Sequence, residues 1–424
     1  MERRRNPWWI PPFLGRVPAG LDDRSLQLLS AVALALLFEE YDLAMLTSTL
    51  KYISADLGMP EKEFGPYLIM IRAGALLAIF IIPLADRLGR RPLFIYSTAA
   101  MGVFTFATAF AQTPMQFVLL QAATRTFFLS GSAAAFVIIT EEFPAEHRGW
   151  GMGMLAALGA VGHGVAAGAF ALIDVLPYGW RALYAFGVIP LLLIPYFLSR
   201  VPETQRFKDH NVEPARFFGL GEVIGPLKAL AVTHPARAAG IALSGFLVSA
   251  ATLPSFQYIG HLVLKGRGWS PGEYSTMVIV GGAIGIIGNI VAGRLGDAYG
   301  RKIVGFTLFS LFPFAAWGVY QGSTAVISAS WVGLVFCSMG GRVVLRALST
   351  ELFPTSHRGA ASGMYSVLET LGGMTGLYIL HRMGTDGVDE IADHTPLVAS
   401  VIVLGAAVLL FFPETRRREL ETIS

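Results

Sequence analysis

The chain has 424 residues, of which 54% are hydrophobic and only 14% are charged. A soluble domain carries about 25% charged residues, so too few charges remain to cover a water-soluble globule of this length. The composition therefore favours a protein that crosses a membrane several times over a soluble protein. The single cysteine, Cys337, excludes an internal disulfide framework, and the net charge of +3 by itself identifies no partner.

Twelve segments are long and apolar enough to be membrane-spanning helices, which need about 20 mostly apolar residues. In chain order the predicted helices cover residues 26–50, 64–85, 91–111, 115–140, 150–173, 179–199, 238–263, 275–295, 303–322, 325–350, 360–381 and 397–412. We therefore predict an all-α membrane protein. Its predicted parts are a tail at 1–25, a six-helix bundle at 26–199, a polar connector at 200–237, a second six-helix bundle at 238–412 and a tail at 413–424.

The distribution of lysine and arginine predicts the orientation of these helices. If both termini lie in the cytoplasm, most of the 32 basic residues lie on the cytoplasmic side. The opposite loops then carry only Lys51, Lys62, Arg181, Lys265, Arg267 and Arg382. Short basic loops stay on the cytoplasmic side of a membrane. We expect a multi-pass protein of the cytoplasmic (inner) membrane with both termini in the cytoplasm.

Three short signatures occur twice, about half a chain apart. The first begins at Asp86 and again at Asp297, an offset of 211 residues. The paired signatures are residues 86–91 with 297–302, 141–149 with 351–359, and 202–206 with 413–417. A nearly constant offset over three signatures predicts two copies of one unit. Duplicated halves in a very apolar chain are typical of secondary transporters whose site lies at the interface between the repeats.

The same signatures resemble those of a known family. Residues 86–91, and more completely residues 293–302, resemble the loop signature of the major facilitator superfamily, although Ile82 stands where the first copy should have glycine. The pattern Glu-x-x-Pro-x-x-x-Arg-Gly, followed by Pro-Glu-Thr, resembles the sugar-porter and metabolite–proton-symporter branch. The resemblance implies two pseudo-symmetric six-helix bundles, a monomeric state, and alternating access by rocking of one bundle against the other.

Opposite charges gather at the predicted cytoplasmic ends of the helices in both halves. Such charges can hold helices together in one conformation and separate in another, which biases a two-state equilibrium. The alternative is that they form permanent structural salt bridges. The predicted cytoplasmic gate consists of Asp86, Arg90, Glu141, Arg148, Asp297, Arg301, Glu351 and Arg358.

Ionisable residues also lie inside the predicted helices, where each costs about 2.5–3.5 kcal/mol on insertion scales and indicates function. The pair Tyr41-Asp42 resembles one in the first helix of proton-linked sugar porters, which implies that Asp42 takes the coupling proton. The fourth-helix arginine of those porters would fall on Gln121, one turn before Arg125 and on the same helix face. The predicted proton-coupling residues are Glu39, Glu40, Asp42 and Arg72, with a static buried network as the alternative.

Arg342 and Arg346 lie one helical turn apart and share a face. Counted from the repeated signatures, they fall on positions that line the sugar site of the porters, and the resemblance implies the same for Glu369 and His163. Arginine presents a fork of donors that matches a carboxylate or phosphate, so an anionic substrate is expected. Alternatively, Glu369 neutralises one arginine with no ligand involved, and His163 is a second proton group or a core residue. The predicted substrate-binding residues are Arg125, His163, Gln257, Arg342, Arg346 and Glu369.

No motif in the sequence indicates catalysis or a cofactor. The phosphate-binding loop of ATP-driven pumps and Cys/His metal arrays are both absent. We therefore expect a proton-coupled symporter of a small organic anion such as a carboxylate, and not an enzyme. It would need the lipid bilayer but no metal, no cofactor besides the coupling protons and no nucleic acid. The alternatives are a proton-linked sugar or polyol symporter, and an efflux antiporter or non-transporting sensor of the same fold.

Overall fold

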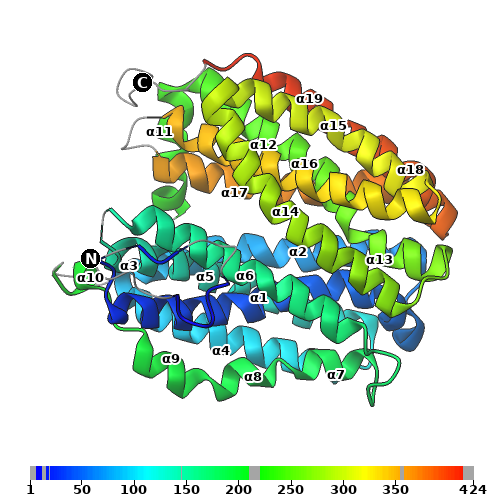
Figure 1. The fold of residues 1–424 in the computed structure, drawn as a ribbon, viewed down its shortest axis with the longest axis horizontal. Helices are drawn as coiled ribbons and strands as arrows, with labels where there is room; N and C mark the ends of the chain where they lie inside the picture. The colour runs from blue at the N-terminus through cyan, green and yellow to red at the C-terminus, as the bar shows by residue number, and fades with distance from the viewer. Residues whose placement is uncertain are drawn as a thin grey trace. The chain divides into compact units, whose positions relative to one another are not determined.

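Twelve helical rods make up the described part of the chain, in agreement with the sequence (Figure 1). The computed structural model describes residues 6–11, 16–18, 20–144, 146–209, 220–353 and 358–413. The first six rods are α1 (Asp23–Leu57), α2 (Phe64–Ile81), α4 (Arg90–Thr108), α5 (Pro114–Glu142), α6 (Arg148–Phe170) and the consecutive pieces α7 (Trp180–Ala185), α8 (Val188–Leu192) and α9 (Ile194–Arg200). The last six are α12 (Pro235–Gln257), α14 (Pro271–Tyr299), α15 (Arg301–Gln321), α16 (Thr324–Glu351), α17 (Arg358–Met383) and the pair α18 (Val388–Ser400) and α19 (Ile402–Leu409).

Short helical segments connect or extend these rods. They are η2 (Glu61–Glu63), η3 (Ile82–Leu84), α3 (Ala85–Leu88), α10 (Gln205–Asp209), α11 (Leu220–Thr233), α13 (Ile259–His261) and the π-helical turn η4 (Leu262–Gly266). The predicted connector at 200–237 thus contains α10 and α11, and α12 begins within it at Pro235. Residues 210–219 of the connector lie outside the described part.

Capping residues fix where several helices begin. The Thr113 hydroxyl accepts the backbone N–H of Gln116 at 3.2 Å, just before a proline whose missing N–H is unused in the first turn. Ser270 and Glu273 cap each other's backbone at the start of α14. The sixth rod is broken into three pieces near Pro190 and Pro195, because proline cannot donate a backbone hydrogen bond inside a helix.

The chain divides into two compact units. The first contains Met1–Leu46, Gly74–Ala169 and Val175–Arg216; the second contains Thr47–Ala73, Phe170–Asp174 and Phe217–Ser424. This division differs from the predicted bundle boundary, because the end of α1 and the first half of α2 belong to the second unit. In the first unit α4 packs along α5, and in the second α12 packs along α17 while α16 lies against α14 and α15.

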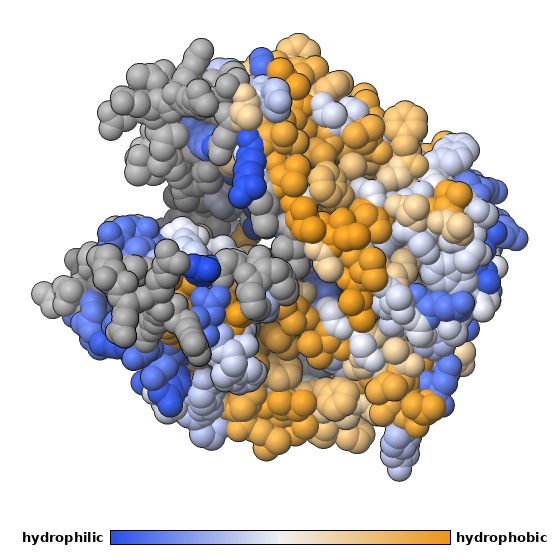
Figure 2. All heavy atoms as spheres, in the orientation of Figure 1, coloured by the Kyte–Doolittle hydropathy of each residue, from blue (hydrophilic) through white to orange (hydrophobic). Residues whose placement is uncertain are grey.

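The outward faces of the long helices are apolar. Leu192 of α8 in the first unit is 73% exposed, and Phe314 of α15 in the second is 74% exposed. Figure 2 shows hydrophobic side chains along the lengths of the helices and hydrophilic ones toward their ends. An apolar surface this extensive on the outside of a fold is stable only in contact with lipid.

Nine of the described helices meet the length and hydropathy expected of a membrane span. The three predicted rods outside that set are α1, α4 and α17. Two of these carry the ionisable residues predicted to be functional, Glu39, Glu40 and Asp42 in α1 and Glu369 in α17, and α4 begins with two arginines. In α1 and α17, the charged residues that make the helix less apolar are therefore among those predicted to be functional.

Candidate functional site

The two copies of the first signature each form a turn between helices at a glycine. Gly89 separates α3 from α4 with φ of 102°, and Gly300 separates α14 from α15 with φ of 105°. Both angles lie in the region that strongly favours glycine. The duplication that the sequence predicts therefore extends to backbone conformation at equivalent positions of the two units.

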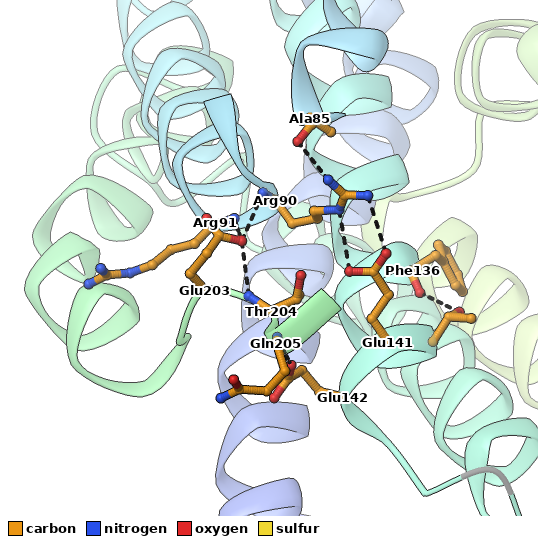
Figure 3. Close-up of polar contacts among 10 residues, drawn as sticks. Ala85, Arg90, Arg91, Phe136, Glu141, Glu142, Glu203, Thr204 and Gln205 are labelled. Carbon is orange, nitrogen blue, oxygen red and sulfur yellow. Dashed lines mark hydrogen bonds and ion pairs between the residues drawn. The ribbon is translucent and has the colours of Figure 1, made fainter. Parts of the chain in front are cut away.

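Glu203 caps the helix that begins at the first of these turns. Its Oε1 accepts the backbone N–H groups of Arg90 at 3.0 Å and Arg91 at 3.4 Å, and also that of Thr204 at 2.9 Å (Figure 3). A carboxylate in this place satisfies N–H groups that have no partner within the helix and complements the helix dipole. The sequence analysis found the Pro-Glu-Thr repeat but not this role, because Glu203 and Arg90 are 113 residues apart. The second copy, from residue 414 onward, lies outside the described residues.

Each unit contains one predicted ion pair beside its turn. In the first, two nitrogens of Arg90 approach the two carboxylate oxygens of Glu141, each at 3.3 Å (Figure 3). In the second, Arg301 pairs with Glu351. These pairs join neighbouring rods of one unit, α4 to α5 and α15 to α16. Arg148 of the predicted gate is half-buried, and the side chains of Asp86, Asp297 and Arg358 lie outside the described part.

The first unit buries a carboxylate and a guanidinium together. Asp42 of α1 and Arg125 of α5 are only 1% and 2% exposed, and the two side chains interact electrostatically. Asp42 Oδ1 accepts the Thr105 hydroxyl at 2.9 Å. Among the described residues, Asp42 Oδ2 and all three guanidinium nitrogens of Arg125 have no hydrogen-bond partner, and the guanidinium lies 5.2 Å from the centre of the Phe128 ring. The carboxyl group of Asp42 and the guanidinium of Arg125 are thus shielded from water but do not hydrogen-bond to each other.

The two glutamates that precede Asp42 have different surroundings. Glu39 is buried and accepts the Ser132 hydroxyl at 2.6 Å. Glu40 lies 3.4 Å from Nδ1 of His163 on α6, and Gly162 allows the close approach because a Cβ there would overlap the carbonyl of Leu37. His163, predicted at the substrate site, is therefore next to one of the predicted proton-coupling residues.

The second unit brings together the three charged residues predicted for the substrate. Arg342 of α16 pairs with Glu369 of α17, and a second oxygen of Glu369 lies 3.9 Å from Arg346. The arginine side chains are 43% and 69% exposed, whereas Glu369 is only 17% exposed. One carboxylate thus stands between two guanidiniums, and this cluster has a net positive charge.

The remaining predicted residues lie in the second unit. Gln257 is buried and donates from Nε2 to the Thr47 hydroxyl at 3.3 Å. Arg72 of α2 is half-buried and makes an interaction of its own. It belongs to a different compact unit from Glu39, Glu40 and Asp42, the acids with which the sequence analysis grouped it.

A polar cluster that the sequence analysis missed joins the last part of α1 and η2 to α13 and η4, all within the second unit. Glu61 pairs with Lys265, and its Oε1 lies 3.4 Å from Nε2 of the buried His261. Lys51 donates to the carbonyl of Leu264 at 3.0 Å. Partners about 200 residues apart leave no periodic signal in a sequence. Segments from the two sequence halves therefore contact each other within the second unit, near the start of α14 and away from its Gly300 end.

Two bundles of membrane-spanning helices with duplicated turns and ion pairs, and with buried charges in the helix interiors, define a membrane transporter. The sequence profile of the Major Facilitator Superfamily matches residues 32–377 and also residues 241–423. The chain belongs to this family, which confirms the resemblance seen in the signatures and shows that the protein is a transporter and not an enzyme.

Individual relatives are distant. The gallate transporter of Pseudomonas putida is 24% identical over 357 residues, covering 77% of this chain and 78% of that protein. The cis,cis-muconate transport protein of Acinetobacter baylyi is 25% identical over 349 residues, covering 79% and 82%. Among solved structures, the inward-open conformation of the xylose transporter XylE from E. coli has a TM-score of 0.75 at 17% identity, covering 94% of this chain and 99% of that one. This likeness establishes the fold.

Proposed function

We propose that this transporter carries a small organic carboxylate together with protons across the membrane. It would work as a monomer without a cofactor, in the cytoplasmic (inner) membrane, with both termini on the cytoplasmic side. The observation that carries the proposal is the cluster in the second unit, where Arg342 and Arg346 both approach Glu369.

The exposure of the two arginines supports a ligand-binding role. Arg342 lies nine residues, and therefore more than two helical turns, before the end of α16 at Glu351. A half-exposed guanidinium at this depth is costly against hydrocarbon, so its exposed surface must face a water-accessible space. The two guanidiniums and the one carboxylate together carry a net positive charge, which favours an anionic ligand. Guanidinium forks match the geometry of a carboxylate.

The acid and base of the first unit supply a route for proton coupling. Asp42 can be ionised while it faces Arg125, and it can be protonated when that electrostatic support is weakened. Since its Oδ2 has no hydrogen-bond partner among the described residues, a proton can bind there without breaking an existing hydrogen bond. A substrate anion or a helix movement that draws Arg125 away would favour protonation, and this linkage is what symport requires.

The relatives favour the same class of substrate. Gallate and cis,cis-muconate, which give two of the relatives their names, are organic acids. At 24–25% identity these names suggest a class of substrate and not a compound. The arginines at the predicted positions, Arg125, Arg342 and Arg346, agree with that class of substrate.

A direct test is substrate-induced thermal stabilisation of the purified protein at pH 6 and pH 8, with mono- and dicarboxylates, sugar phosphates and neutral sugars. A ligand at 100 times its dissociation constant stabilises a protein by about 2.7 kcal/mol. We expect stabilisation by a carboxylate, stronger at pH 6, which Arg342→Ala removes. Arg382→Ala, at an exposed position at the end of α17, is the matched control and should keep it.

A proton-linked sugar or polyol symporter is the second candidate. Glu369 approaches both arginines. In this alternative, Arg342 and Arg346 only pair with Glu369 and stabilise the helices, and they do not bind the substrate. In that case only neutral sugars would stabilise the protein, and Arg346→Ala would leave the stabilisation intact. That result would replace the carboxylate proposal.

A further inference from the structure

A basic cleft lies at the end of the first unit where α1 and α4 begin. It has a volume of about 430 Å³ and is lined by residues of α1, α4, α9 and α10. Four of the lining residues are basic, Arg24, Arg91, Arg200 and Lys208, and one is acidic, Glu203. These four cations belong to neither predicted functional group, so neither the transport proposal nor the gate accounts for them.

Two acids at or near the cleft, Glu203 and Asp22, accept hydrogen bonds from backbone N–H groups. Glu203 uses Oε1 to accept three backbone N–H groups. Asp22 lies within electrostatic reach of Arg24, but it caps α1 by accepting the N–H of Ser25 at 2.9 Å. Within the described residues, none of the four lining cations forms an ion pair with a side-chain carboxylate. The cleft therefore keeps a strongly positive potential.

Neutral acceptors hold two of the guanidiniums in place. Arg91 donates to the carbonyl of Leu198 at 2.7 Å, and Arg200 donates to the side-chain oxygen of Gln27. A guanidinium has five N–H donors, so most remain available. Nε of Arg91 is buried and has no hydrogen-bond partner among the described residues. Oriented guanidiniums with unused donors match the oxygens of a phosphate group.

The position of the cleft favours the phosphate of a lipid headgroup over that of a soluble compound. Leu198, which lines it, is 45% exposed, and the neighbouring α8 carries Leu192, one of the most exposed apolar residues of the unit. Figure 2 shows hydrophilic side chains at this end of the unit beside the hydrophobic surface over α8. The cations thus lie where the lipid-facing surface meets water, at the level of lipid headgroups. Basic residues in this place attract anionic phospholipids.

We propose that this cleft binds the phosphate headgroup of an anionic phospholipid, whose acyl chains lie along α8 and α9. Because Arg91 follows the turn at Gly89 and Glu203 caps the helix that begins there, a bound headgroup would tie α1, α9 and α10 to the start of α4. The lipid would thereby stabilise the first unit at the end that carries the Arg90–Glu141 pair. A soluble phosphate compound offers the same chemistry without the acyl chains.

The test is a titration of the detergent-solubilised full chain with micelles containing phosphatidylglycerol, followed by thermal unfolding. Phosphatidylcholine micelles and inorganic phosphate are the comparison ligands. Arg200→Gln with Lys208→Gln removes two cations of the cleft. Lys228→Gln with Arg382→Gln removes the same charge at two exposed positions outside it and controls for nonspecific attraction.

We expect phosphatidylglycerol to raise the unfolding temperature of the wild type and of the control variant, with little effect of phosphatidylcholine or inorganic phosphate. The cleft variant should bind phosphatidylglycerol about 25-fold more weakly, because each basic residue near an anionic surface contributes about a fivefold factor. Equal titration curves for the cleft and control variants would overturn the site. Stabilisation by inorganic phosphate equal to that by phosphatidylglycerol would overturn the lipid assignment.

Discussion

Replacing Gly89 by alanine tests whether the backbone conformation of the first turn and the Glu203 carboxylate that caps α4 depend on each other. At φ of 102° and ψ of 156°, Gly89 has a backbone conformation that costs an L-residue about 1–3 kcal/mol. An added Cβ would also overlap Oε2 of Glu203 and lie 2.9 Å from its Cδ. Moving that carboxylate weakens charge-assisted hydrogen bonds to backbone N–H groups, which contribute about 1.5–3 kcal/mol.

Together these effects predict that Gly89→Ala lowers the free energy of unfolding by about 3–5 kcal/mol. The corresponding fall in unfolding temperature is roughly 3–6 °C, at about 1 °C per kcal/mol for a chain of this size. The measurement is thermal unfolding in detergent. Gly153→Ala is the control, since nothing lies within 4 Å of a Cβ at this position in α6. It should be neutral or slightly stabilising, because alanine favours a helix over glycine.

A double-mutant cycle separates the two causes. If the clash with Glu203 contributes, Gly89→Ala should cost measurably less in a Glu203→Ala background, because the overlapping carboxylate is gone. An equal cost in both backgrounds would show that only the backbone angle matters. An unfolding temperature unchanged by Gly89→Ala would refute the described turn itself.

Three further predictions concern the charged residues. Asp42→Asn should retain substrate binding but abolish pH-driven uphill uptake, and full uphill uptake by this variant would exclude Asp42 as the coupling group. Glu351→Gln leaves Arg301 without its ion pair and should lower the free energy of unfolding by about 1.5–3 kcal/mol; an unchanged thermal unfolding curve would mean that the pair is dispensable. Glu61→Gln should weaken the cluster with Lys265. The buried Ser48 of α1 lies 3.3 Å from the hydroxyl of Tyr274 of α14, so a Ser48→Cys side chain should then react faster with an impermeant maleimide; an unchanged rate would show that this cluster does not hold α1 against α14.

The sequence predicted the rods and the repeat well because both depend on local or translational patterns. Twelve apolar segments follow from the cost of burying polar groups in lipid. The offset of 211 residues predicted two copies of one unit, and the turns at Gly89 and Gly300 have similar backbone angles. Helical periodicity also placed Arg342 and Arg346 on one face, where the structure brings Glu369 to them.

Contacts between distant segments could not be predicted in the same way. Hydropathy gives the length of a helix but not its rotation against its neighbours, so the contact of Glu40 with His163 did not emerge from the sequence. Glu61 and His261 are separated by 200 residues, and both stand at helix ends where no apolar period applies. The division of α1 between the two compact units likewise depends on packing that composition does not record.

The most direct test of the proposed transport is uptake into proteoliposomes with an imposed pH gradient. Vesicles that are acidic outside and neutral inside should accumulate a radiolabelled carboxylate, identified by thermal stabilisation, above its external concentration. A protonophore should abolish that accumulation, and vesicles containing Arg342→Ala protein should show none. Equal accumulation with and without the pH gradient, or accumulation of neutral sugars only, would contradict proton-coupled transport of an organic anion.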